Sequence, residues 1–231
     1  MSEADSVPRK ARPPLPQGLR TFAADWASDQ EVFKRVHWGK AMMWIFLLSD
    51  TFIFSSFLVS YMTMRSSVTE AWPNASEVFA LEFGGQPIPL ILIAIMTFVL
   101  ISSSGTMAMA VNYGYRRNRK VTAALMFATA ALGATFVGMQ AFEWSKLIEE
   151  GVRPWGNPMG AAQFGASFFM ITGFHGLHVS AGVIMLLIVA TKVLRGHYDR
   201  SGDYSAVEIA GLYWHFVDLV WVFIFAFFYL W

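Results

Sequence analysis

Apolar residues along the chain gather into five long runs that are separated by shorter polar connections. The runs cover about residues 38–64, 88–112, 121–147, 163–193 and 207–230. Because about 20 apolar residues rising 1.5 Å each cross the hydrocarbon core of a bilayer, every run is long enough to span it as a helix. The pattern therefore predicts an all-α integral membrane bundle of five transmembrane helices.

The residues before the first run have a different character. Residues 1–37 are polar, include four prolines and lack the apolar run of a signal peptide. We expect a polar, proline-containing tail followed by a transmembrane domain over residues 38–231. Pro87 and Pro89 are expected at the start of the second helix, where a missing backbone N–H costs no hydrogen bond.

Basic residues predict how the bundle is oriented. Fourteen of the seventeen Lys and Arg residues lie within residues 1–40 or in the connections 113–120 and 192–206. These segments fall on one side of a five-helix topology, and the other side has only Arg65, Lys146 and Arg153. Since cytoplasmic connections carry the excess of Lys and Arg, we expect a cytoplasmic N-terminus and a periplasmic C-terminus.

The composition is typical of a membrane protein and argues against some classes of site and partner. Charged residues make up 14% of the chain, whereas soluble domains are nearer about 25%. Cysteine is absent, which excludes disulfides, thiolate metal sites and a cysteine nucleophile. The net charge of +1 gives no reason to expect a nucleic-acid partner.

Acidic and histidine side chains lie well inside the predicted helices. A charged group at the centre of a transmembrane helix costs at least ~2.5–3.5 kcal/mol on insertion, so such residues are candidates for function. Five are expected near the middle of the bilayer, and Glu143 is expected near the outer end of the third helix. The six candidates are Asp50, Glu143, His175, His178, His215 and Asp218.

Three interpretations of these residues compete. Histidines ligate haem and metals, but no Glu-x-x-His or His-Glu-x-x-His spacing supports this, and haem would need an opposed pair on two helices. A proton relay would need groups that reach both membrane surfaces, whereas most of these lie at mid-depth. Polar groups also pair simply to fix helix register and partner contacts. We favour structural pairing, and we expect no catalytic residue, no metal ligand and no cofactor of this chain's own.

Particular strings within the runs carry a family resemblance. The fourth run contains Thr172-Gly-Phe-His-Gly-Leu-His-Val179, and the fifth contains Tyr213-Trp-His-Phe-Val-Asp218. Less specific strings occupy the first three runs: Trp38-Gly39 followed by Leu48-Ser-Asp50, then Ser102-Ser-Ser-Gly-Thr106, then Gln140-Ala-Phe-Glu143-Trp144. In this order the strings resemble subunit III of the haem-copper oxygen reductases, the cytochrome c oxidase family.

The resemblance implies a function as well as a fold. Subunit III of that family holds no haem or copper, packs on the catalytic subunit I, supports proton uptake there and protects the enzyme during turnover. It implies a non-catalytic subunit of a respiratory terminal oxidase in a bacterial inner membrane. Subunit I is the expected direct partner, with subunit II, further respiratory-complex subunits and bound phospholipid. Haem and copper are expected in the partner subunits.

Two departures from the family pattern matter. Asp50 stands where the family usually has glutamate, so it is either a proton-exchange site or a packed hydrogen-bond partner of the fourth or fifth helix. Longer members have seven helices, the first two forming one wall of a lipid-holding cleft, and this chain resembles only the last five. Alternatives are the nitric oxide reductase accessory protein of the same superfamily, a stand-alone proton channel and a haem protein that uses the histidines.

Overall fold

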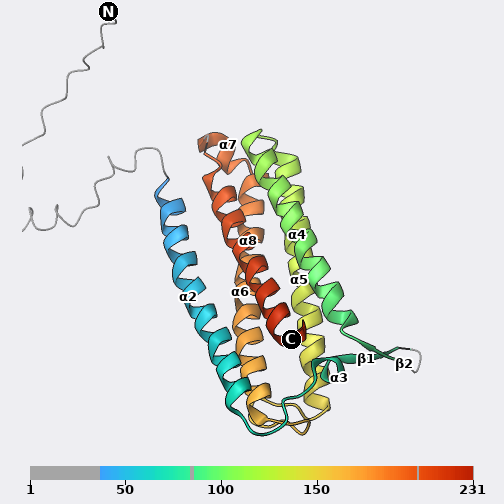
Figure 1. The fold of residues 1–231 in the computed structure, drawn as a ribbon. Helices are drawn as coiled ribbons and strands as arrows, with labels where there is room; N and C mark the ends of the chain where they lie inside the picture. Colours follow the sequence, from blue (N-terminus) through green and yellow to red (C-terminus); the bar gives the residue numbers. More distant parts are fainter. Residues whose placement is uncertain (1–36, 84–85, 202, 231) are drawn as a thin grey trace, which may run out of the picture. The chain divides into compact units, whose positions relative to one another are not determined.

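The computed structural model describes residues 37–83, 86–201 and 203–230. Five helices in this part of the chain are long and apolar enough to cross a membrane. They are α2 (Trp38–Ser67), α4 (Ile91–Tyr115), α5 (Arg119–Glu149), α6 (Ala162–Leu194) and α8 (Ser205–Phe225), which continues into the π-helix η1 (Ala226–Leu230) (Figure 1). The prediction of five membrane-spanning helices is confirmed. The predicted tail lies outside the described residues, except for its last residue, His37.

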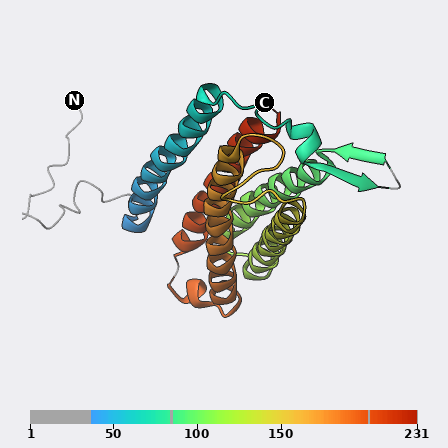
Figure 2. The same ribbon diagram turned by 90° about the horizontal axis from the view of Figure 1, so that it is seen from below.

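Four of these helices form a closed ring of packed neighbours. α4 packs on α5, α5 on α6, α6 on α8, and α8 back on α4. α2 lies beside α6 and α8, outside this ring (Figure 2). It buries a single stripe of side chains spaced three or four residues apart: Leu47, Asp50, Phe54, Leu58 and Tyr61. α2 is therefore held along one face, and most of its surface is available to lipid or to another chain.

Trp214 of α8 fills the space inside the ring. Its side chain is fully buried, and its indole Nε1 donates a hydrogen bond of 2.9 Å to Ser103 Oγ on α4. A Cβ atom added at Gly133 of α5 would lie 2.3 Å from Cη2 of this indole, and one added at Gly182 of α6 would lie 2.9 Å from Cζ3. The two glycines therefore allow α5 and α6 to approach the large ring closely.

The start of α4 differs from the prediction. Residues expected to begin this helix instead form the strand β2 (Gln86–Pro89), which pairs antiparallel with β1 (Ala80–Phe83). α4 begins at Ile91, after Leu90 with a φ of 59°. Pro87 and Pro89 are tolerated in β2 because a two-stranded sheet has only edge strands, where a missing N–H need not break a ladder. The short helix α3 (Ala75–Val78) precedes this hairpin.

Ion pairs and a hydrogen bond join several helix ends at one end of the bundle. Lys40 Nζ lies 2.6 Å from Glu208 Oε1, which joins the starts of α2 and α8. Arg119 Nη1 lies 3.8 Å from Asp199 Oδ2, which joins the start of α5 to the short helix α7 (His197–Ser201). Burial and the Asp199 carboxylate raise the pKa of Tyr204 to about 12, so its hydroxyl remains a donor to Asp199 at neutral pH. These connections carry many of the chain's basic residues.

Candidate functional site

The first polar group in the bundle interior joins α2 to α6. Asp50 Oδ2 lies 3.0 Å from His178 Nε2, and both side chains are nearly buried, although the two atoms lack standard hydrogen-bond alignment. His178 Nδ1 lies 2.8 Å from the Phe174 carbonyl oxygen. Because a carbonyl oxygen only accepts, Nδ1 carries a proton. One further proton between Nε2 and the carboxyl gives either a neutral pair or an imidazolium facing a carboxylate, and both have no net charge.

His175 is one turn from His178 but has a different environment. Its ring is fully buried, and neither ring nitrogen has a hydrogen-bond partner among the described residues. It stacks on Trp221 with 5.4 Å between ring centroids and meets the edge of Phe136 at 5.8 Å. Aromatic pairs of this kind add to the packing energy of a core. The structure therefore separates two histidines that the sequence places at similar depth.

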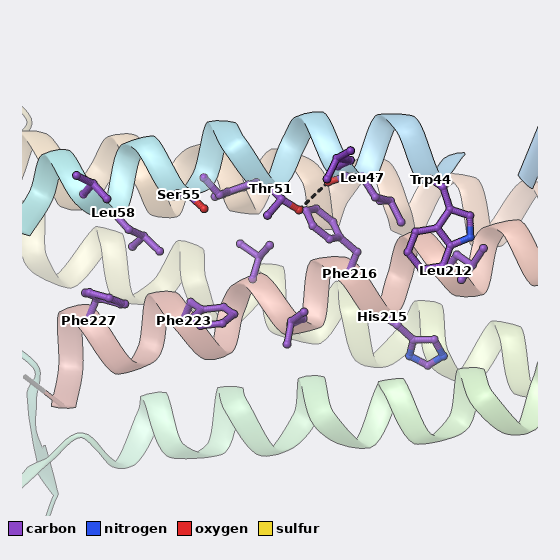
Figure 3. A pocket seen from close by; sticks show the side chains of 15 residues that line it. Trp44, Leu47, Thr51, Ser55, Leu58, Leu212, His215, Phe216, Phe223 and Phe227 are labelled. Carbon is purple, nitrogen blue, oxygen red and sulfur yellow. Dashed lines mark hydrogen bonds between the residues drawn. The ribbon is translucent and has the colours of Figure 1, made fainter. Parts of the chain in front are cut away.

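A second polar group lies where α4 meets α8. Ser104 Oγ is 2.6 Å from His215 Nδ1, and the Asp218 carboxyl group lies close enough to Ser104 to interact with it. The His215 ring is directed from α8 toward α4 (Figure 3). Since an ionised carboxylate only accepts, one consistent order is donation from His215 to Ser104 and from Ser104 to Asp218. We call Ser104, His215 and Asp218 the α4–α8 cluster; each of its members is only partly buried.

A third polar group surrounds Glu143 in the last turns of α5. Gln140 Nε2 donates a hydrogen bond of 2.6 Å to Glu143 Oε2. The Tyr229 hydroxyl lies 3.3 and 3.2 Å from the two carboxyl oxygens. Tyr229 and Glu143 are both buried. Tyr229 belongs to η1, and its position depends on this π-helical end of α8, which no pattern in the sequence indicates.

The six candidate residues thus fall into separate environments and do not converge on one centre. Within the described ranges, no three His, Asp or Glu side chains lie together in a way that could hold a metal ion. Sequence reasoning did not single out Ser104 or Tyr229, which complete two of the polar groups. Ser104 lies within the string Ser102-Ser-Ser-Gly-Thr106, which entered the sequence analysis only through the family resemblance.

An apolar groove runs between α2 and α8. Its volume is about 640 Å³, within the range of small-molecule pockets, and its walls include Trp44, Phe216 and Phe223 (Figure 3). The Thr51 hydroxyl at this groove already donates to the Leu47 carbonyl. The lining therefore suits an apolar chain better than a charged substrate.

Comparison with known proteins finds one matching family and several relatives. The family model described as cytochrome c oxidase subunit III matches residues 24–231. A protein of Staphylococcus aureus strain USA300 named "Probable quinol oxidase subunit 3" is 34% identical over 196 residues, which cover 83% of this chain and 89% of that protein. A protein of the same name from Staphylococcus saprophyticus is 31% identical over 195 residues, covering 83% and 90%. These matches show that the chain, with its five spans, belongs to the cytochrome c oxidase subunit III family of the haem-copper oxidases.

Proposed function

We propose that the chain is a non-catalytic subunit of a respiratory terminal oxidase in a bacterial inner membrane. It packs on the haem-copper catalytic subunit, supports proton uptake there and stabilises the enzyme during turnover. The observation that supports this role is the pairing of intramembrane polar groups within the chain, as Asp50 pairs with His178. Such pairs fix helix register and hold the polar side chains in separate contacts within the described residues. Oxygen reduction belongs to the partner subunit, which holds the haem and copper.

Purification in mild detergent tests this proposal. A tagged chain is expected to bring down a larger haem-copper subunit and subunit II, with one copy of each. The isolated chain is expected to show no Soret absorption and no stoichiometric metal. A tightly bound haem in the isolated chain would contradict the proposal, as would a stable homo-oligomer that conducts protons in liposomes and has no oxidase partner.

The electron donor of the complex has two candidates. The matching family model is described as cytochrome c oxidase subunit III, which favours reduced cytochrome c as the electron donor. The Staphylococcus relatives carry the name quinol oxidase, which favours a quinol. Oxygen consumption by the intact complex, supplied with each donor in turn, distinguishes the two. The donor is set by other subunits, so the role of this chain is the same in both cases.

Phospholipid is the proposed occupant of the groove between α2 and α8. An acyl chain is apolar along its length, and most of the groove lining is apolar as well, with Thr51, Ser55 and His215 as its polar members. Replacing Leu219 or Val59 in the groove by Trp is expected to reduce the phospholipid that co-purifies with the complex. Ile184→Trp on the exposed surface of α6 is a control of equal bulk. Equal lipid content in all three variants would contradict this assignment.

A further inference from the structure

Glu143 is a buried carboxyl group whose hydrogen-bond partners are neutral. It is 4% exposed and lies six residues before the end of α5 at Glu149, which is about 9 Å along the helix axis. Its partners among the described residues are Gln140 and Tyr229. The next basic residue of α5, Lys146, lies 3.4 Å from Glu150. A carboxylate buried in apolar surroundings without a cation is costly, so the protonated, neutral form is favoured.

The two partners can accommodate the carboxyl group in its protonated form. Gln140 Nε2 donates to Glu143 Oε2, which leaves Oε1 to carry the proton. The Tyr229 hydroxyl lies 3.3 Å from Oε1 and 3.2 Å from Oε2. Because a hydroxyl group both donates and accepts, it can accept the proton of Oε1 or donate to a carboxylate. Tyr229 therefore suits the neutral acid and the ionised form from the same position.

A narrow cleft leads from Glu143 toward the surface at this end of the bundle. α3 lies beside the last turns of α5 (Figure 1), and the cleft is lined by residues in and after α3, by α4 and by α5. Lys146, whose side chain is 28% exposed, lies beside Glu143 in this lining, and the other members are apolar: Val78, Phe79, Leu92, Ile93 and Leu147. The cleft volume of about 10 Å³ gives room for about one water molecule. The carboxyl group is therefore buried without being sealed from solvent.

Few titratable groups surround this carboxyl group among the described side chains. η1 presents Tyr229, and α5 presents Lys146. His175 of α6 stacks on Trp221 of α8, and Trp221 in turn lies 6.2 Å from Tyr229 between ring centroids. The cleft residues of α3 and α4 are apolar. Within these contacts, no second carboxyl group meets Glu143 to share a proton with it.

We propose that Glu143 is a proton-binding site, which holds a proton at neutral pH and exchanges it through the cleft with the aqueous phase at this end of the bundle. The bound state is the neutral carboxylic acid, and release of the proton leaves a carboxylate that accepts from Gln140 and Tyr229. The site differs from the Asp50–His178 pair, in which a carboxyl group shares its proton with an imidazole. It goes beyond the proposed function and does not depend on it, because it concerns only the residues of this chain.

Infrared spectroscopy of the full chain in its native complex detects the bound proton directly. A protonated carboxyl group has a C=O stretching band that a carboxylate lacks, and Glu143→Gln removes the acid while keeping the size of the side chain. The wild-type spectrum at neutral pH is expected to contain a band that is lost in Glu143→Gln. Glu149→Gln, a change at an exposed carboxyl group on the same helix, is the control and is expected to keep the band. Identical C=O absorption in the wild type and Glu143→Gln would overturn the proposal, because Glu143 would then be ionised.

Tyr229→Phe tests the assignment of the band while keeping the carboxyl group. The band is expected to shift in frequency, because the carboxyl group loses its contact with the hydroxyl group. This variant also keeps the test decisive if Glu143→Gln fails to assemble. A band at the wild-type frequency in Tyr229→Phe would show that it belongs to a different carboxyl group, and it would overturn the proposal.

Deuterium exchange tests the cleft as the route. After transfer into heavy water, the band shifts as a deuteron replaces the proton of Glu143. Leu92→Trp places a larger side chain in the cleft and is expected to slow this shift. Ile95→Trp, at a position of α4 that is 48% exposed, adds equal bulk away from the cleft and is expected to leave the rate unchanged. Equal exchange rates in the two variants would overturn the cleft as the path of the proton.

Discussion

Asp50 is the residue whose chemistry can be separated most cleanly from its packing. Asp50→Asn keeps the shape of the side chain and can donate a hydrogen bond to His178 Nε2, but it cannot exchange a proton. We expect assembly and oxygen consumption near the wild-type values, because the contact with His178 is buried and internal to the chain. Turnover of the intact complex measured from about pH 6 to 9 checks this. A loss confined to high pH, where proton supply limits turnover, would identify Asp50 as a working proton site.

Asp50→Leu acts on the same contact in a different way. It leaves His178 Nε2 without a partner in the apolar interior, which costs roughly 1–3 kcal/mol. We expect less of this variant to remain in the complex, with normal turnover for the fraction that does. Subunit ratios on a denaturing gel measure the loss, and Ser49→Ala, a change at an exposed neighbour on the same helix, is the control. Full retention of Asp50→Leu would argue against a structural role.

Sequence reasoning predicted which helix holds each polar residue better than it predicted their partners. Helix rise gives the position of Asp50 along its helix directly, but the rotation of each helix and the choice of neighbour depend on packing across the bundle. His178 was one of several possible partners on two helices. The stacking of His175 on Trp221 followed from no spacing within either helix. Which side chain on a distant helix becomes the partner of a polar residue depends on how the helices pack. A single sequence does not reveal that packing directly.

Helix packing depends on contacts that a single methyl group can block. Gly133→Ala places a Cβ where the Trp214 ring lies 2.3 Å away, so the indole or α5 must shift. Overpacking of this kind typically costs about 1–3 kcal/mol. We expect a lower midpoint of thermal unfolding for the purified complex. Gly138→Ala on the same helix is the control, because a Cβ there meets nothing within 4 Å. Equal midpoints for the two variants would contradict the packing of Trp214 against α5.

The elements themselves were predicted more completely than their connections. Five long apolar runs leave little choice of structure in a bilayer, because a helix satisfies its own backbone groups. The segment before α4 has no such constraint. Pro87 and Pro89 are compatible with a helix start and equally with an edge strand, and the structure adopts the strand. The sequence therefore predicted the start of α4 to within three residues, but it did not predict the strand that precedes it.

The whole molecule has an orientation that its charges predict. The basic connections before α5 and before α8 lie at the end where Lys40 meets Glu208. If that end is cytoplasmic, green fluorescent protein fused to the N-terminus is expected to fluoresce, and alkaline phosphatase fused to the C-terminus is expected to be active. The reverse pair of fusions is the control. Activity of both reporters only in the reversed arrangement would contradict the predicted orientation.

The Asp50–His178 pair also has a consequence for the order in which the chain is made. Asp50 enters the membrane with the first span, whereas His178 belongs to the fourth span and is made 128 residues later. At about 5–20 residues per second, synthesis of the intervening chain takes roughly 6–26 s. During that interval the first helix holds a carboxyl group in the bilayer without its partner. An unpaired carboxyl group within a span is costly in the bilayer, so we expect a chain truncated before α6 to be less stable in the membrane than the full chain.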